Sequence, residues 1–150
     1  MLLTAFEHSR LDELVLMWRE SFETGVGVTD PHPLEDQRHY FLSQVLPAHD
    51  VRLGMLDERL VGFIAASRSM VAQLYVRVGF QRRGIGSSLL RWAKEQSGGT
   101  LRLFTFARNA GACAFYERNG FVIVARGFEP TWGLDDVEYA WTAIANTAFG

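Results

Sequence analysis

One segment restricts the fold of this chain more than any other: a strand, a glycine-bearing turn and a helix follow one another directly. Val71 to Val78 has the pattern of a buried strand. The turn Gln81-Arg82-Arg83-Gly84-Ile85-Gly86 comes next. Ile85, Leu89, Trp92 and Ala93 then share one face of a helix that Gly98-Gly99 closes. This arrangement predicts a mixed α/β domain built on a central sheet.

Two helices are expected before this segment. Ser9, with Asp12 three residues later, is typical of a helix start, and Gly25 suits the end of that helix. A second helix is expected to begin at Pro33 and to end at Pro47. Proline is favoured at the first helical position and breaks a helix further along.

The remaining segments alternate between strands and helices. Val51–Leu56 and Leu60–Ser67 are expected to form a hairpin. After the helix that follows the turn, we expect a strand at Leu101–Phe106 and a short helix at Ala110–Arg118. The last two strands are expected at Phe121–Arg126 and Asp136–Ile144. The order is two helices, three strands, helix, strand, helix and two strands. We therefore expect a single domain over residues 1–150, of the α/β (α+β) class.

Composition excludes several functional classes. The formal net charge of −2 argues against nucleic-acid binding by bulk electrostatics. Cys113 is the only cysteine, which leaves no internal disulfide or multi-cysteine metal site. No apolar run approaches the roughly 20 residues that cross a bilayer, and the first ten residues lack the pattern of a signal peptide. A cytoplasmic protein with no metal and no membrane partner is expected.

The glycine-bearing turn has the chemistry of an anion site. A strand, a turn and the start of a helix present free backbone N–H groups and a partial positive charge. Gly84 and Gly86 allow close approach and positive φ, Arg82 and Arg83 add guanidinium groups, and Ser87 adds a hydroxyl. A tight turn with two solvent-facing arginines is an equal alternative. The spacing fits neither a P-loop nor the dinucleotide fingerprint, because Leu89 stands where the latter has its third glycine.

Two motifs together resemble the GNAT superfamily of N-acetyltransferases. The first is Gln-x-x-Gly-x-Gly after the strand Leu74-Tyr75-Val76. The second is Asn109-x-x-Ala112-x-x-x-Tyr116-Glu117-x-x-Gly120-Phe121. Their spacing also matches, and the resemblance covers Val71 to Arg126, about half the chain. It implies a mixed, mostly antiparallel central sheet flanked by helices, and acetyl-CoA as co-substrate.

The resemblance also implies roles for individual residues. The backbone of Leu74, Tyr75 and Val76 would bind the pantetheine arm. The turn from Gln81 through Arg82, Arg83, Gly84, Ile85 and Gly86 to Ser87 would hold the pyrophosphate. Asn109 would contact the cofactor, Ala112 would leave room for its arm, and Tyr116 would protonate the departing thiolate. One departure is Val78-Gly79-Phe80, where family members often have a proline and a short polar residue.

The expected reaction is direct attack by a neutral amine on the thioester. Cys113 is the alternative nucleophile, and a packing role for it is favoured. Some relatives place a glutamate on the strand matching Val71–Val78, which has no acid here. The general base therefore stays open among a water chain and the side chains of Glu20, Glu23, His32, His39, Glu129, Asp135 and Glu138.

The acceptor is expected to be a small-molecule or peptide amine, bound between the first two helices and the late strands. Aromatic residues in those segments are candidates for its pocket: Trp18, Phe22, Tyr40, Phe41, Trp132, Tyr139 and Trp141. A homodimer is left open. The alternatives are a non-catalytic acyl-CoA sensor that binds a partner protein and a transferase for longer acyl chains.

Overall fold

The computed structural model describes residues 1–144, which form seven strands and four α-helices with short helical turns between them. In chain order the elements are β1 (Leu2–Ala5), α1 (Leu11–Val26), α2 (Leu34–Tyr40), β2 (Asp50–Leu56), β3 (Arg59–Ala66), β4 (Val71–Val76), α3 (Ile85–Gln96), β5 (Thr100–Phe106), α4 (Ala110–Arg118), β6 (Val122–Glu129) and β7 (Leu134–Thr142).

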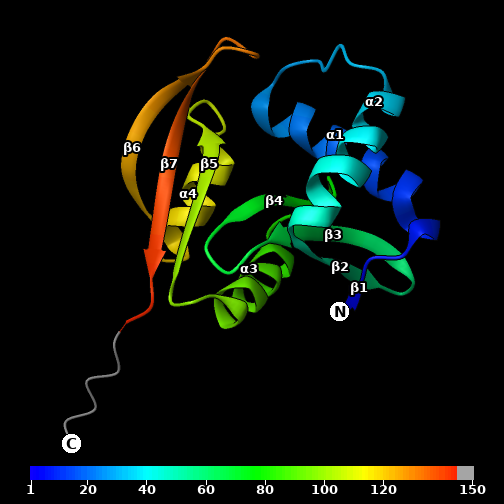
Figure 1. The fold of residues 1–150 in the computed structure, drawn as a ribbon, viewed down its shortest axis with the longest axis horizontal. Helices are drawn as coiled ribbons and strands as arrows, with labels where there is room; N and C mark the ends of the chain where they lie inside the picture. Colours follow the sequence, from blue (N-terminus) through cyan, green and yellow to red (C-terminus); the bar gives the residue numbers. More distant parts are fainter. Residues whose placement is uncertain (145–150) are drawn as a thin grey trace, which may run out of the picture.

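The strands form two antiparallel sheets, with the orders β1-β2-β3-β4 and β5-β7-β6. Within residues 1–144 a parallel bridge between Met70, just before β4, and Arg102 of β5 joins the two sheets. Figure 1 shows β5, β7 and β6 on one side of the molecule and β1 to β4 on the other. The predicted mixed architecture, with antiparallel strands flanked by helices, is confirmed, and its central sheet is divided between β4 and β5.

Helices cover both faces of the first sheet. All of β3 after Arg59 is buried. Phe63 packs with α1 and with the turn after α2, while Ile64, on the opposite face, packs with Leu89 and Leu90 of α3. Strand residues alternate between faces, so β3 contributes to two hydrophobic clusters. The α3 cluster continues through α4 into the second sheet, which fixes the two sheets relative to each other.

The helix ends differ from those predicted. Ser9 lies in a 3-10 turn (His8–Arg10), and no side chain caps α1. The helix continues past Gly25 to Val26, and Gly27 ends it with φ of 76°. The last turns of α1 contact α4. The second helix ends at Tyr40 and continues as a π turn (Phe41–Val45) and a 3-10 turn (Leu46–Ala48) that contains Pro47.

The strand predictions hold with shifted ends, and one strand was missed. The expected hairpin is confirmed, with its turn at Asp57 and Glu58 and with Arg59 already in β3, and so is the helix Ala110–Arg118. β7 begins at Leu134 and ends at Thr142, two residues before Ile144. The missed strand is β1, which has only four residues, half of them exposed, and therefore shows no clear alternation of apolar and polar residues. It forms because it pairs with β2, about 50 positions later in the chain.

Candidate functional site

The turn between β4 and α3 is shaped by the side chain of Gln81. Its amide oxygen accepts a hydrogen bond from the Gly79 N–H at 3.0 Å, and its amide nitrogen donates to the Val76 carbonyl at 3.1 Å. Arg82 and Gly84 have φ of 65° and 80°, in the left-handed region. These two residues lead the chain into α3. Gln81 therefore holds the turn, and it also lines the larger cavity described next.

The first turn of α3 presents backbone N–H groups to a cavity. No side chain caps this helix, and the N–H of Ser88 makes an early helical bond, to the Gly84 carbonyl at 3.0 Å. Gly84, Gly86 and Ser87 line a cavity of about 710 Å³, called the larger cavity below. The first N–H groups of a helix lack partners within it, so this wall attracts anions.

Gly86 allows close packing of two helices and does not adopt a left-handed backbone conformation. It lies inside α3 and has no positive φ, so that part of the prediction is wrong for Gly86 and right for Gly84. A methyl group at Gly86 would lie 3.0 Å from Cζ of Phe115 on α4. At Gly84, by contrast, a methyl group would meet nothing within 4 Å. Gly86 lets α3 and α4 approach each other at the cavity wall.

The two arginines of the turn have different surroundings. Arg82 lines the larger cavity, as does Arg118 of α4, which the sequence did not single out. The Arg83 guanidinium lies over the Phe80 ring, 4.9 Å from its centroid, and Arg59 lies 5.2 Å from the same centroid. Such contacts are favourable cation–π pairs. Two cationic side chains therefore border the cavity, while Arg83 is held against an aromatic ring.

Tyr116 on α4 lines both the larger cavity and a smaller one of about 210 Å³. Only 7% of this residue is exposed. Within residues 1–144 the Tyr116 side chain makes no hydrogen bond, whereas neighbouring Tyr139 donates to Glu117 at 2.6 Å. Burial raises the pKa of Tyr116, and the nearby Tyr75 and Cys113 raise it further. The hydroxyl thus keeps its proton at neutral pH.

Asn109 lies at the start of α4 and contacts the end of α1. Its Oδ1 accepts a hydrogen bond from the Ala112 N–H at 3.1 Å, which caps the helix. Its Nδ2 is so near Gly25 that a methyl group there would lie 2.8 Å away. Asn109 and Ala112 line both cavities. The cap therefore positions the helix that carries Tyr116.

The smaller cavity lies between β4 and β5, beyond their single bridge. Its lining residues come from α1, β4, β5, α4 and the β6–β7 end of the second sheet: Ser21, Phe22, Val26, Val71, Ala72, Gln73, Leu74, Tyr75, Leu103, Phe104, Thr105, Phe106, Asn109, Ala112, Tyr116, Glu129 and Asp136. Two of them are carboxylates and none is Lys, Arg or His. This lining favours a cationic ligand.

Strand β4 divides the two cavities. Leu74 lines both, and a β-bulge between Ala65 and Ala66 leaves Ala72 as the extra residue in this strand. The Tyr75 side chain points the other way, stacked on Phe63 with ring centroids 6.0 Å apart. Burial raises the pKa of Tyr75 to about 12.

The Val76 carbonyl already accepts two hydrogen bonds. One comes from the Gln81 amide and the other from the Ser21 hydroxyl of α1. Ser21 also lines both cavities. The expected pantetheine contact is therefore better served by the backbone of Leu74, at the wall between the cavities, than by the Val76 carbonyl.

Comparison with known proteins agrees with this geometry. Residues 47–123 match a model described as an acetyltransferase (GNAT) domain, which covers just over half of the chain. The chain belongs to the GNAT acetyltransferase family. A comparison with curated protein sequences found no match.

Several solved structures share the fold. A GCN5-related N-acetyltransferase from Rhodopseudomonas palustris has a TM-score of 0.80 and 17% identity, over 94% of each chain. Apo YjaB from Escherichia coli has a TM-score of 0.77 and 19% identity, over 96% of this chain and 100% of its own. The PaiA N-acetyltransferase from Thermoplasma acidophilum, in complex with coenzyme A, has a TM-score of 0.72 and 19% identity, over 94% and 98%.

Of the aromatic residues predicted for the acceptor pocket, the GNAT domain places only Phe22 in the lining of the smaller cavity. Trp132 packs on Phe22, with ring centroids 5.0 Å apart. Trp18, Phe41 and Tyr139 are buried in the core, Trp141 packs on Lys94, and Tyr40 is half exposed. Five of these aromatic side chains thus belong to packing or to the surface.

The candidate bases are also dispersed. Glu129 lines the smaller cavity. The sequence singled out Asp135 as a candidate, but the neighbouring Asp136 lines this cavity instead. The others lie outside the lining of both cavities: Glu20, Glu23, His32, His39, Asp135 and Glu138. Some have structural partners, since His32 pairs with Asp30 at 2.7 Å and Glu138 pairs with Arg102 at 3.0 Å.

Cys113 lines neither cavity of the GNAT domain. Its Sγ lies 3.8 Å from the Phe106 carbonyl, and the residue packs against the cluster that contains Tyr116 and Tyr139. This placement supports packing over nucleophilic attack. Within residues 1–144 no group of three or more His, Cys, Asp or Glu side chains is placed to hold a metal ion. None of the helices there is long and apolar enough to cross a membrane.

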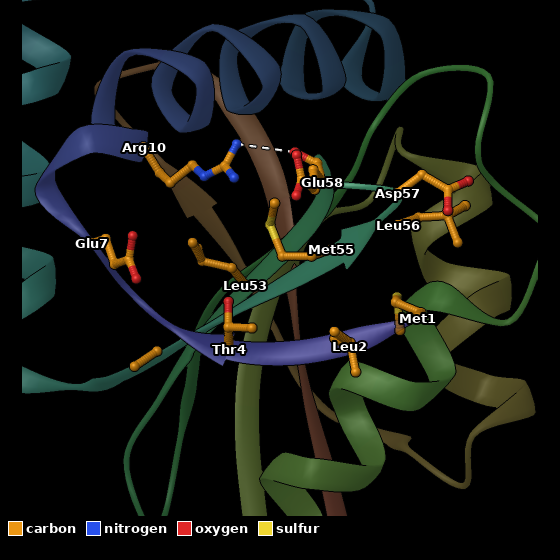
Figure 2. A pocket seen from close by; sticks show the side chains of 11 residues that line it. Met1, Leu2, Thr4, Glu7, Arg10, Leu53, Met55, Leu56, Asp57 and Glu58 are labelled. Carbon is orange, nitrogen blue, oxygen red and sulfur yellow. Dashed lines mark hydrogen bonds between the residues drawn. The ribbon is translucent and has the colours of Figure 1, made fainter.

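A third hollow, of about 470 Å³, lies at the far edge of the first sheet. Figure 2 shows its wall of apolar side chains from β1 and β2, with Arg10 donating to the Glu58 carbonyl across it at 3.1 Å. It shares no lining residue with the cavities beside Tyr116. This hollow is therefore separate from the candidate site.

Proposed function

We propose that this GNAT domain transfers an acetyl group from acetyl-CoA to a primary amine of a small molecule or peptide. The observation that carries the proposal is the position of Tyr116. Tyr116 is 7% exposed, makes no side-chain hydrogen bond within residues 1–144 and lines both cavities. One cavity would hold the donor and the other the acceptor, so the group that moves a proton stands between them.

The residues of the larger cavity fit acetyl-CoA. The amides at the start of α3 and the guanidinium groups of Arg82 and Arg118 suit a diphosphate, which carries several negative charges. The open space around Gly84 lets an anion approach the main chain. From there the cavity continues past Asn109 and Ala112 to Tyr116. Acetyl-CoA, when bound there, supplies the acetyl group as a thioester.

In the proposed step the amine nitrogen forms a bond to the acetyl carbon and the carbon–sulfur bond breaks. Tyr116 donates its hydroxyl proton to the sulfur as the thiolate leaves. Because burial raises the pKa of Tyr116, the phenol is present in the protonated form that this role requires. β4 carries no acidic residue, so we assign the loss of the amine proton to water at the mouth of the smaller cavity.

The proposal is tested by a screen of amines that follows the release of free CoA from acetyl-CoA. Release that depends on an amine and saturates with its concentration is the expected result. Binding of acetyl-CoA without release on any amine would refute transfer and would favour a non-catalytic sensor. Mass spectrometry of acyl-CoA species that co-purify with the protein tests acetyl against longer acyl chains.

A further inference from the structure

The two carboxylates of the smaller cavity have no cationic partner among residues 1–144. Glu129 and Asp136 belong to none of the ion pairs in that part of the chain, where other half-buried carboxylates such as Asp30 and Glu138 are paired. No Lys, Arg or His lines the cavity with them. Two like charges at one cavity wall are unfavourable unless a cation joins them.

The backbone holds both carboxylates in place. Asp136 lies opposite Phe106 on β5 and opposite Gly127 on β6. A methyl group at Gly127 would lie 2.8 Å from Asp136 Oδ1, so the glycine leaves room for the carboxylate. Glu129 accepts a hydrogen bond from the Trp132 N–H at 2.7 Å. That N–H lowers the pKa of Glu129, which is charged at neutral pH.

Within the smaller cavity, the two carboxylates lie at some distance from Tyr116. Tyr116 packs on Tyr139, with ring centroids 5.9 Å apart. Asp136 precedes Tyr139 by three residues along β7, so their Cα atoms are roughly 10 Å apart and their side chains point to opposite faces of the strand. Phe22 and Phe106 form part of the wall between these ends. Tyr116, which is 7% exposed and makes no side-chain hydrogen bond within residues 1–144, lines the same cavity, so a further polar group besides the carboxylates marks it as a binding site.

We infer that Glu129 and Asp136 select an acceptor with two positive charges, a diamine whose amino groups are separated by several methylenes. One amine loses its proton and lies beside Tyr116. The other stays an ammonium and pairs with the two carboxylates, while the methylenes lie along the aromatic wall. This inference rests on the proposed function and names its acceptor class.

The experiment compares three acceptors of similar length. Hexamethylenediamine has a second amine, hexylamine ends in a methyl group, and aminocaproic acid ends in a carboxylate. For the wild-type protein kcat/KM should be about tenfold higher for the diamine than for hexylamine, as for a hydrogen bond to a charged group. It should be lowest for aminocaproic acid, which the cavity carboxylates repel.

Substitutions then locate the effect. Asp136→Asn and Glu129→Gln should each reduce the ratio of kcat/KM for the diamine to kcat/KM for hexylamine severalfold, mainly through the KM for the diamine. Asp135→Asn is the matched control, because Asp135 is exposed and its side chain lies on the opposite face of β7. It should leave all three acceptors unaffected. Equal thermal unfolding of the variants verifies that each one folds.

The outcomes separate the inference from the proposed function. Equal kcat/KM for the diamine and hexylamine, or a preference that Asp136→Asn and Glu129→Gln both leave intact, would refute the inference while transfer to amines stands. Absence of turnover with every amine would refute transfer. Calorimetry of hexamethylenediamine binding would then decide the inference by itself, since binding that both substitutions leave unchanged would also overturn it.

Discussion

Tyr116 and Tyr139 offer a paired test of which hydroxyl acts in the reaction. They are adjacent, and the structure gives them opposite surroundings. Tyr116 lines both cavities and has no hydrogen-bond partner within residues 1–144. Tyr139 lines neither, is fully buried and donates to Glu117 at 2.6 Å. Changing each to phenylalanine removes one oxygen from each environment.

For Tyr116→Phe we expect kcat to fall by about 10²–10⁴-fold, the usual contribution of a positioned general acid. KM for the amine should change little, because the proton is donated only as the thiolate leaves. No protein hydrogen bond of the described residues is lost, so the free energy of unfolding should stay within about 0.5 kcal/mol of the wild type.

For Tyr139→Phe the pattern should be reversed. The bond to Glu117 is charge-assisted, but Glu117 is exposed, so we expect a loss of about 1 kcal/mol in the free energy of unfolding. That loss corresponds to about 3 °C in Tm for a chain of this size. The value of kcat should change less than about threefold, since this hydroxyl does not line the site.

Steady-state kinetics that follow free CoA, together with thermal unfolding, read out both variants. A Tyr116→Phe protein with kcat within threefold of the wild type would show that the hydroxyl is not the proton donor. If Tyr139→Phe loses activity as strongly as Tyr116→Phe at unchanged stability, the assignment of roles by cavity lining would be wrong.

Four further predictions concern the glycines, the pH dependence of activity, the pH dependence of stability, and Cys113. Gly86→Ala should lower the free energy of unfolding by about 1–3 kcal/mol through its contact with Phe115, and Gly84→Ala by about 1 kcal/mol through its φ of 80° alone; thermal unfolding measures both, and a larger loss at Gly84 would contradict the packing role of Gly86. The value of kcat/KM should rise with pH as the acceptor amine loses its proton, with no decline below about pH 10, because the raised pKa of Tyr116 keeps the phenol protonated; a plateau near neutral pH would instead point to a protein base. The same shifts act on stability, since Tyr75 and Tyr116 ionise in the unfolded chain first, so the free energy of unfolding should fall as pH rises past about 10. Cys113→Ala should retain turnover, and loss of both turnover and an acetylated-protein species in that variant would make Cys113 the nucleophile.

The elements that form the proposed donor side could be predicted from sequence because their signals are local. The strand, turn and helix around Gly84 are contiguous, and the cap at Asn109 and the side chain of Tyr116 lie on one short helix. Propensity and spacing act over such distances. The same reasoning misjudged Gly86, because its neighbour Phe115 is distant in sequence and becomes close only when α3 packs on α4.

The acceptor side could not be predicted because it depends on how the two sheets diverge. Asp136 and Glu129 reach the smaller cavity through the pairing of β7 with β5 and β6, which brings together segments far apart in the chain. Alternation along β7 leaves open which of Asp135 and Asp136 faces the cavity, because a shift of one residue exchanges the two faces. The pairing of Asp136 with Phe106 resolves that choice.

The central claim is direct transfer of an acetyl group from acetyl-CoA to an amine beside Tyr116. Its most direct test is mass spectrometry after incubation of the protein with acetyl-CoA deuterated in the acetyl group and an amine acceptor. Direct transfer predicts one labelled acetylamine for each CoA released, with the mass of the protein unchanged. Release of CoA without labelled amine, or a labelled acetyl group on the protein that later passes to the amine, would contradict it.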